Sequence, residues 1–282
     1  MNEKKDWADL HTHTTFSDGS LSPEELLRIA EQIGLRAIAI TDHDTIDAIK
    51  PATYLSGKYH IEIIPAIELG TQVGSVELHF LGYFIDIESK ALIHYLNHIK
   101  TTRKNRAAAI LKKLRRFGLH LKLDDVLKKA GQGSVGRPHI AAAMVERGLV
   151  STFQEAFDLW IGDGRPAHVN KGNYHPEELI SLIHQAGGIA VLAHPGNRLS
   201  MKLLQRFIKA GLDGIEVIHP SHDDPTRKSL QTLAREYGLL MTGGSDFHGF
   251  RSHTNVFGHY VIPYQVVEQL KKYKARRLHL SP

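Results

Sequence analysis

Histidines and carboxylates recur in this chain where short apolar stretches end. The first group, "DLHTHTTFSDG" at residues 9–19, places His11 and His13 two positions apart, with Asp18 five residues further on. Imidazole nitrogens and carboxylate oxygens are the ligands by which proteins hold zinc, manganese and iron. Such metals bind phosphate oxygens and lower the pKa of water. The segment therefore predicts a metal site, provided that more ligands follow at comparable places.

Residues of the same types do end the later apolar stretches. Those at or just beyond an expected strand are His11, His13, Asp18, Asp42, His43, Glu68, His194, His219, His222, Asp246 and His248, while His79 lies within the strand "ELHF". Parallel α/β sheets and barrels build their active sites at the C-terminal ends of their strands. We therefore expect one cluster of nitrogen and oxygen ligands. Asp42 has an alternative role, which is to cap a helix that begins at Asp44.

The elements that must position this cluster alternate between apolar strands and amphipathic helices. An apolar strand over 7–11 precedes a helix in which Ser22 is the N-cap, Glu25 completes a capping box and Gly34 follows the C-terminus. The segment "HPEELISLIHQAGGIAVLAHP" at 175–195 repeats the pattern of "SPEELLRIAEQIGLRAIAITDH". Such repetition of β/α units is typical of a barrel.

Strand patterns give way to helical ones between these two regions. Two strands are expected over 61–70 and 75–85, with a hairpin between them as one arrangement. A long helix over 91–118 and shorter ones near 123–130, 138–147 and 152–159 follow. We predict a barrel built from residues 1–87 and 166–282, with a helical subdomain inserted at 88–165.

Composition excludes several classes of function. The 282 residues are 42% hydrophobic and 23% charged, as in a soluble globular domain, and they include no cysteine. Disulfides, thiolate zinc sites and cysteine nucleophiles are therefore absent. No apolar run approaches the roughly 18 residues of a membrane span, and no signal segment precedes the first strand, so we expect a cytoplasmic protein. The net charge of +5 mildly favours phosphate or nucleic-acid partners.

Five motifs in this order resemble those of the PHP (polymerase and histidinol phosphatase) domain family. They are "DLHTHTTFSDG", "ITDHD", "AIEL", "LAHPG" and "GSDFH". The helical insertion between the third and fourth motifs resembles the branch with 3′,5′-nucleoside bisphosphate phosphatases and a 5′→3′ exoribonuclease. The resemblance implies an α/β fold, namely a distorted (β/α)7 barrel with a trinuclear metal centre.

Carried over by position, the resemblance implies three metal sites. One holds its metal through His11, His13, Glu68 and Asp246, a second through Asp18, His43 and His248, and a third through Glu68, His79 and His194. Some family members have histidine at the position of Asp18. The harder oxygen ligand favours Mn²⁺ or Fe²⁺ over Zn²⁺ there. We expect three divalent ions, with Mn²⁺ favoured.

Residues outside the cluster are candidates for binding substrate. Arg137, at the start of a helix in "GSVGRPHIA", can grip a phosphate in bidentate fashion, and Lys171 and His139 are weaker candidates. Either His219 or His222 is expected to face the metals. We favour His222 to contact the phosphate or to protonate the leaving oxygen.

The basic run within residues 100–116 has two interpretations. It is typical of the solvated side of an amphipathic helix whose Ile110, Leu111 and Leu114 point inward. A surface that binds nucleic acid is the alternative.

Together these residues predict a metal-dependent phosphoesterase that acts through a hydroxide shared between metals. The expected substrate is a 3′,5′-nucleoside bisphosphate that loses its 3′-phosphate, or the 5′ end of a short RNA; no protein partner is inferred. Alternatives are a phosphatase of the histidinol-phosphate type and a non-catalytic PHP-like module. No Walker A motif is present, and "GGS" before Asp246 is not the elbow of a serine hydrolase.

Overall fold

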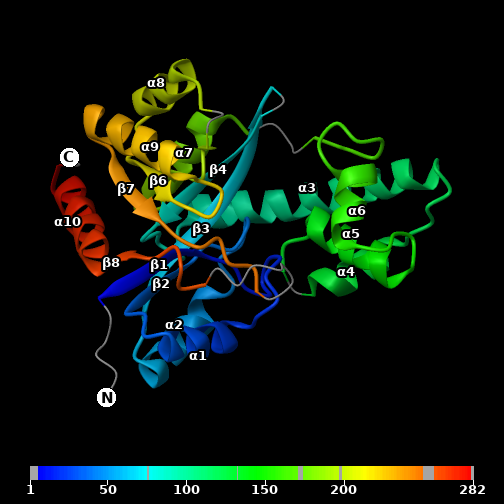
Figure 1. The fold of residues 1–282 in the computed structure, drawn as a ribbon, viewed down its shortest axis with the longest axis horizontal. Helices are drawn as coiled ribbons and strands as arrows, with labels where there is room; N and C mark the ends of the chain where they lie inside the picture. Colours follow the sequence, from blue (N-terminus) through cyan, green and yellow to red (C-terminus); the bar gives the residue numbers. More distant parts are fainter. Residues whose placement is uncertain are drawn as a thin grey trace.

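A single sheet of eight strands organises the computed structural model, which describes residues 6–74, 76–131, 133–170, 174–196, 199–249 and 257–280. The strand order is β7-β6-β5-β4-β3-β2-β1-β8 (Figure 1). The strands are β1 Trp7–Thr12, β2 Ala37–Ile40, β3 Glu62–Val73, β4 Val76–Tyr83, β5 Ile189–Leu192, β6 Gly214–Ile218, β7 Leu240–Gly243 and β8 Ile262–Pro263.

The sheet curls until its two sides nearly meet. Thr12 pairs with Phe247 beyond the end of β7, and the backbone N–H of His13 donates to the carbonyl of Phe247 at 2.9 Å. The result is a nearly closed barrel, and the predicted α/β fold class is confirmed. Strand β4 is the main departure from regular β/α alternation, because it follows β3 through a hairpin and runs antiparallel to both β3 and β5.

Helices cover the outer face of the barrel. They are α1 Pro23–Gln32, α2 Ile49–Tyr59, α7 Pro176–Gln185, α8 Met201–Lys209 and α9 Asp224–Glu236. The first begins as its sequence predicts, since Ser22 and Glu25 cap each other's backbone N–H groups. Strand β2, "AIAI", is buried along its whole length because helices cover one face and the barrel interior covers the other.

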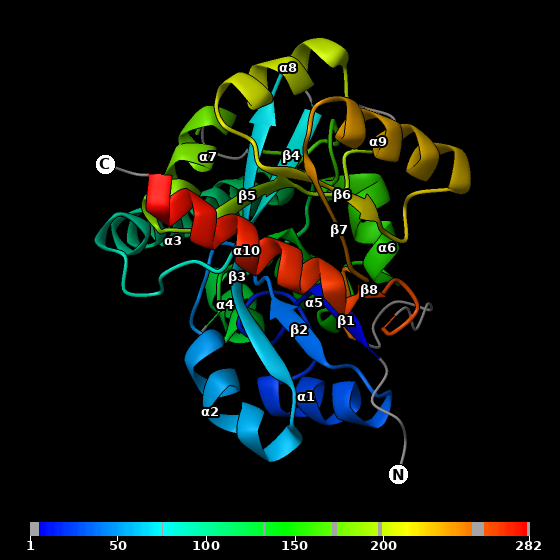
Figure 2. The same ribbon diagram turned by 90° about the vertical axis from the view of Figure 1, so that its left-hand side faces the viewer.

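Helix α10, Tyr264–Leu280, closes one end of the barrel (Figure 2). Tyr264, Val267 and Leu270 join the core inside the strands. Tyr273 and Arg277 bind the carboxylate of Asp213, which immediately precedes β6. The helix therefore covers the N-terminal ends of the parallel strands and leaves their C-terminal ends for the predicted cluster.

Helix α3, Lys90–Arg115, extends from the barrel into a second group of helices (Figure 1). The group comprises α4 Leu123–Ala130, α5 Arg137–Glu146, α6 Phe153–Ala156 and the π-helix η1 Phe157–Ile161. We call this group, with the second half of α3, the helical lobe. Leu92 and Ile99 in the first half of α3 pack in the barrel core, whereas Ile110 and Leu114 pack in the core of the lobe.

The predicted boundaries of the insertion, 88–165, stay a prediction, because α3 contributes to both cores. Among the described residues, no helix is long and apolar enough to cross a membrane.

The close approach of β1 to the segment after β7 requires a glycine at position 244. A Cβ atom there would lie 2.3 Å from the backbone nitrogen of His11, whereas a Cβ at Gly57, within α2, would meet no atom within 4 Å. We expect Gly244→Ala to destabilise the fold by about 1–3 kcal/mol through overpacking. Gly57→Ala, the control, should stabilise α2 by about 0.5–1 kcal/mol. Urea unfolding of the two variants checks this, and equal stabilities would contradict it.

Candidate metal centre

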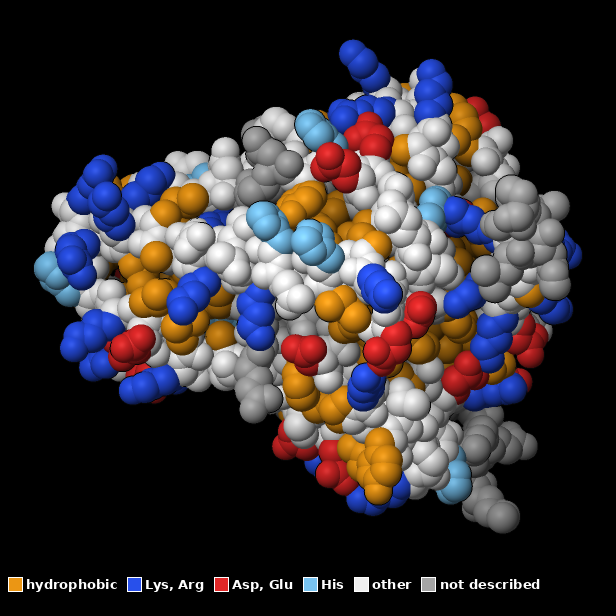
Figure 3. Space-filling model, turned by 180° about the vertical axis from the view of Figure 1, so that it is seen from behind, with side chains coloured by type: hydrophobic (Ala, Val, Ile, Leu, Met, Phe, Trp, Pro, Cys, Tyr) orange, Lys and Arg blue, Asp and Glu red, His pale blue; other side chains and the backbone are white. Residues whose placement is uncertain are grey.

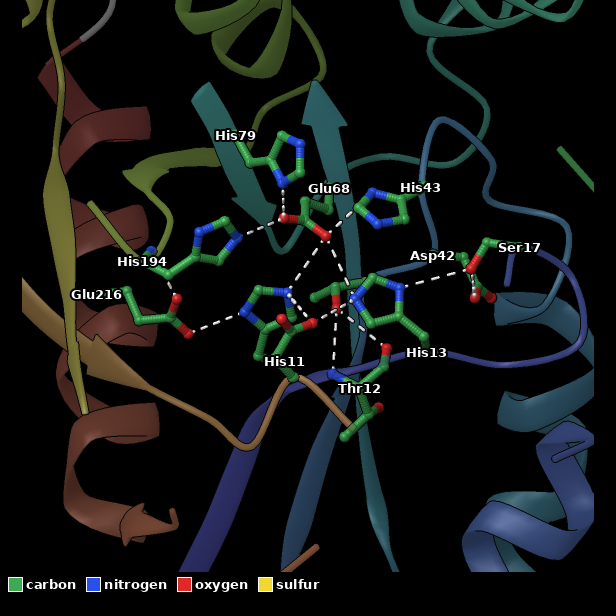
Figure 4. Close-up of polar contacts among 12 residues, drawn as sticks. His11, Thr12, His13, Ser17, Asp42, His43, Glu68, His79, His194 and Glu216 are labelled. Carbon is green, nitrogen blue, oxygen red and sulfur yellow. Dashed lines mark hydrogen bonds and ion pairs between the residues drawn. The ribbon is translucent and has the colours of Figure 1, made fainter. Parts of the chain in front are cut away.

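The predicted ligands converge at the C-terminal end of the barrel (Figure 4). His11 and His13 stand at the end of β1, and His43 and His194 lie just beyond β2 and β5. Glu68 and His79 lie within the neighbouring strands β3 and β4. His194 and Asp246 adopt positive φ angles of 26° and 50°. Non-glycine residues rarely adopt this conformation, and it often accompanies functional sites.

The carboxylate of Glu68 lies at the middle of the cluster, where the side chain is 1% exposed. Its Oε1 atom lies 2.7 Å from Nδ1 of His79. Five imidazoles have a nitrogen within 3.3 Å of one of its two oxygens, and they belong to His11, His13, His43, His79 and His194. One carboxylate can therefore bridge ions that these rings hold.

Two groups match predicted metal sites closely. His11, His13, Glu68 and Asp246 each offer one ligand atom, and these atoms lie within 4.8 Å of one another. A second group with the same property consists of Asp18, His43 and His248, joined by His13. Nε2 of His248 lies 3.2 Å from Asp18.

The three ligands of the third predicted site do not form one such compact group. His79 and Glu68 form a group with His43 rather than with His194. His194 still contacts the site, because its Nε2 atom lies 3.0 Å from the same Oε1 atom of Glu68 that His79 approaches.

Charge balance explains how so many ionisable groups are buried together. Burial alone would raise the pKa of Glu68, but the facing rings, His43 and His79 foremost, hold that pKa well below its usual range. Burial would lower the pKa of His13, yet its contacts with Asp246 and Glu68 raise it to about 10. Imidazolium groups thus compensate the carboxylates, and a divalent cation would replace their protons.

One buried nitrogen supports the fit to a metal directly. Burial lowers the pKa of His43 well below its usual value, against the opposing charges of Glu68 and Asp18, so this ring gives up its proton readily. In the described part of the chain, no group makes a hydrogen bond with the buried Nδ1 of His43, although Glu68 lies 3.1 Å away. An imidazole that is readily deprotonated, beside a carboxylate, is suited to bind a cation.

Glu216 was missed by the sequence reasoning, although it contacts two of the predicted ligands. Its Oε1 atom lies 2.9 Å from Nδ1 of His11, and its Oε2 atom accepts the backbone N–H of His194 at 2.8 Å. A carboxylate behind a metal-ligating histidine fixes its tautomer and orientation. The sequence does contain one indication of this role, which is a charged residue within the apolar strand "GIEVI". In the structure the side chain of Glu216 is fully buried.

Asp42 does not cap a helix, as its alternative role required. Its carboxylate accepts the N–H of Thr14 at 2.7 Å, and hydroxyl groups of Thr14 and Ser17 at 2.6 Å. It therefore anchors the loop that carries Asp18. Asp44 pairs with Arg103 instead.

The two histidines after β6 have different environments. Nε2 of His219 lies 3.3 Å from Asp246, and its ring centroid is 4.9 Å from that of His194. His222 approaches the backbone with both nitrogens, Nδ1 lying 2.9 Å from the carbonyl of Val217 and Nε2 accepting the N–H of Gly196 at 3.1 Å. This arrangement favours His219, rather than the predicted His222, at the reacting centre.

A cavity of about 150 Å³ lies beside the cluster, where the helical lobe meets the barrel. Asp18, His43 and His79 line one side of it, and the guanidinium groups of Arg103, Arg106 and Arg137 line another. We call it the guanidinium pocket. The sequence predicted Arg137 there, but not Arg103 or Arg106.

The three guanidinium groups are partnered to different degrees. Arg103 pairs with Asp44, and Arg137 donates to Glu77 at 2.8 Å and to Asp163 at 2.6 Å. Arg106 donates only its Nε–H to a backbone carbonyl among the described residues. Burial, and then the charges of Arg137 and Arg103, lower the pKa of Arg106 to about 10. An anion in this pocket would relieve that repulsion.

His139 and Lys171 were the two weaker candidates for binding substrate. His139 accepts the backbone N–H of Gly136 at 3.0 Å at the start of α5, which is a capping role. Lys171 lies outside the described residues.

Comparison with known proteins agrees with these features. The PHP domain model matches residues 9–212. A 5′-3′ exoribonuclease Rnm of Escherichia coli is 36% identical over 85% of this chain and 84% of its own length. A 3′,5′-nucleoside bisphosphate phosphatase of Chromobacterium violaceum is 30% identical over 85% of this chain and 86% of its own.

The fold has a close counterpart among solved structures. A crystal structure described as a putative metal-dependent phosphoesterase from Bifidobacterium adolescentis superposes with a TM-score of 0.87 at 30% identity, covering 93% of this chain and 94% of that one. The chain belongs to the PHP domain family and is a metal-dependent phosphoesterase.

Proposed function

We propose that this phosphoesterase removes the 3′-phosphate from 3′,5′-nucleoside bisphosphates and cleaves the corresponding bond at the 5′ ends of short RNAs. The proposal is supported chiefly by the residues that the metal centre and the guanidinium pocket have in common. Asp18, His43 and His79 belong to both. A substrate with two phosphates on one sugar would present one to each.

Three divalent ions would occupy the cluster in this proposal, with the ligands assigned from the sequence and with Glu68 shared between sites. The donors are nitrogen and oxygen throughout, which suits Mn²⁺, and also Fe²⁺ or Zn²⁺. Bound ions would supply Lewis acidity and lower the pKa of water.

The guanidinium pocket would hold the 5′-phosphate. Arg106 and Arg137 offer planar donor groups that match phosphate oxygens in bidentate fashion. The carboxylates that now accept from Arg137, Glu77 and Asp163, are partly exposed and can give way to a more highly charged anion. Lys171 remains a candidate for the same phosphate.

His219 would donate a proton to the leaving 3′-oxygen. Its Nε2 atom faces Asp246 at 3.3 Å, and its Nδ1 atom is fixed by the hydroxyl of Ser221 at 2.8 Å. Proton donation to a poor leaving group is a general-acid contribution of about 10²–10⁴-fold. The original candidate for this role, His222, is held by backbone groups on both sides.

One chemistry covers both substrates, because the bond between O3′ and phosphorus is the same in each. In the bisphosphate the products are a nucleoside 5′-phosphate and inorganic phosphate. In a 5′-phosphorylated RNA, the attacked phosphorus also carries the rest of the strand. Hydrolysis then releases the first nucleotide as a nucleoside 5′-phosphate and leaves a shorter RNA with a new 5′-phosphate. A cavity of about 500 Å³ on the other side of His79 and Glu77 has room for that substituent.

Removal of a central carboxylate tests the metal centre. Asn tolerates the positive φ of Asp246 but is a weak ligand. We expect Asp246→Asn to lose at least one equivalent of Mn²⁺ by elemental analysis. We also expect kcat to fall by roughly 10²-fold or more, since a positioned metal supplies several kcal/mol. The exposed Glu31→Gln variant is the control. A folded Asp246→Asn protein with full metal content and rate would exclude this assignment.

The leaving group distinguishes the two histidines. We expect His219→Asn to reduce hydrolysis of an alkyl phosphate about 10²-fold or more. Hydrolysis of p-nitrophenyl phosphate should change little, because p-nitrophenolate leaves without a proton. His222→Asn should lower thermal stability and affect both esters alike. The opposite pattern would restore His222 to the catalytic role.

Arg137→Ala tests the second phosphate. The variant should lose roughly 10²-fold or more in kcat/KM on a 3′,5′-bisphosphate, taking about 1.5–3 kcal/mol for each of two charged hydrogen bonds. Activity on p-nitrophenyl phosphate should persist, because it has no second phosphate. Arg115→Ala, an exposed change on α3, is the control. Equal losses on both substrates would mean that Arg137 serves the reacting phosphate. No loss on either would remove the support for a bisphosphate pocket.

A further inference from the structure

The segment that contains α3 and the rest of the helical lobe is strongly basic, whereas the remainder of the chain is slightly acidic. Residues 90–165 contain 15 Lys and Arg against 6 Asp and Glu, whereas the rest of the chain contains 20 against 24. Figure 3 shows Lys and Arg side chains over the end of the lobe, with hydrophobic side chains between them and few acidic ones on this face. The lobe is therefore a cationic body attached to a mildly anionic barrel.

Most cations at the far end of α3 have no acidic partner. Lys112, Arg115 and Arg116 are exposed, and no ion pair forms with any of them within the described ranges. Where Lys and Arg only keep one face of a helix in contact with solvent, acidic residues commonly lie three or four positions away from them. Residues 100–116 include none.

Partly exposed aromatic side chains lie on the same lobe, and Phe117 directly follows these cations in the chain. Phe117 is 51% exposed, and its ring lies 5.7 Å from that of Trp160, measured between centroids. Phe153, 41% exposed, contacts Phe157 at 5.3 Å in the same way. Exposed aromatic rings interleaved with Lys and Arg are the features that bind single-stranded nucleic acid, by stacking on bases and pairing with phosphates.

This surface is continuous with the catalytic end of the barrel. Phe157 lines the guanidinium pocket, and Asp163 lines the larger cavity next to His79. Trp160 lies between those two residues on the same short segment. Along α3, Arg106 is in the pocket and Arg115, the last residue of the helix, lies nine residues further, roughly 14 Å away along the helix axis, with Phe117 just beyond it.

We propose that the helical lobe is a sequence-independent binding surface for single-stranded RNA downstream of the scissile phosphate. This inference rests on the proposed function, because the strand would leave the larger cavity beside Asp163. It would then cross Trp160 and Phe117, where the bases stack, while its phosphates approach the unpaired cations of α3.

The experiment compares charge reversal on the lobe with the same reversal on the barrel. The lobe variant is Lys112→Glu, Arg115→Glu and Arg116→Glu together. The matched control is Lys202→Glu, Lys209→Glu and Lys228→Glu, three exposed lysines on barrel helices. Phe117→Ala tests stacking separately. Each protein is assayed on adenosine 3′,5′-bisphosphate and on a 5′-phosphorylated ten-nucleotide RNA, at 50 and 200 mM salt.

We expect the lobe variant to lose about tenfold or more in kcat/KM on the RNA at low salt while its rate on the bisphosphate matches that of the control. The slope of log(kcat/KM) against log salt should decrease by about 2, at roughly 0.7 for each lost phosphate contact to a single strand. Phe117→Ala should lose about tenfold on the RNA alone, the scale of one stacked base. Equal losses on both substrates, or equal losses in both triple variants, would overturn the proposal.

Binding separates this proposal from the proposed function. Fluorescence anisotropy with a labelled ten-nucleotide RNA measures affinity without any turnover. Suppose that the wild-type protein hydrolyses neither substrate but binds RNA at least tenfold more tightly than the lobe variant. The proposed substrates would then be wrong, whereas the RNA-binding surface on the lobe would be supported. Equal RNA affinity of the wild type and the lobe variant would exclude the surface, whatever the activity.

Discussion

The rest of the structure depends on burying one carboxylate among five imidazoles. Glu68 can remain ionised at the barrel mouth only because positively charged or metal-bound rings face both of its oxygens. The five rings come from four separate parts of the chain, so the barrel must bring the ends of β1, β2 and β5 within a few ångströms of β3 and β4. The approach of β1 to the segment after β7, the strained backbone at His194 and Asp246, and the carboxylate of Glu216 behind His11 all serve that convergence.

Much of this could be predicted because its determinants are local in sequence. The capping box at Ser22, the apolar strands and the histidines at their ends each appear within a few residues of one another. The helical segment was also predictable, since its apolar positions recur at helical spacing; α3 ends at Arg115 rather than near Gly118, where the chain turns. The reversed direction of β4 was uncertain because a hairpin and a crossover begin with similar residues, and its pairing with β3 and β5 fixes it.

Contacts between distant segments were harder to predict. Glu216 lies 205 residues from His11, and nothing near it in sequence indicates that contact. Arg103 and Arg106 were assigned to a solvated helix face, because helical periodicity does not reveal which flank of α3 meets the barrel. His219 and His222 lie only three residues apart, in the turn between β6 and α9. Their roles depend on whether the backbone of Gly196 and Val217 is within reach, which is a tertiary property.

Helix α3 runs through both hydrophobic cores and therefore fixes how the lobe is oriented relative to the barrel. Its first half is packed by the barrel, through Leu92 and Ile99, and its second half by the lobe, through Ile110 and Leu114. Since an α-helix turns about 100° per residue, inserting or deleting one residue between Ile99 and Ile110 would rotate the whole lobe about the helix axis. The guanidinium groups would then leave the pocket although every residue of the metal cluster stayed in place. The number of residues in this stretch of helix is therefore fixed by the orientation that the lobe must have relative to the barrel.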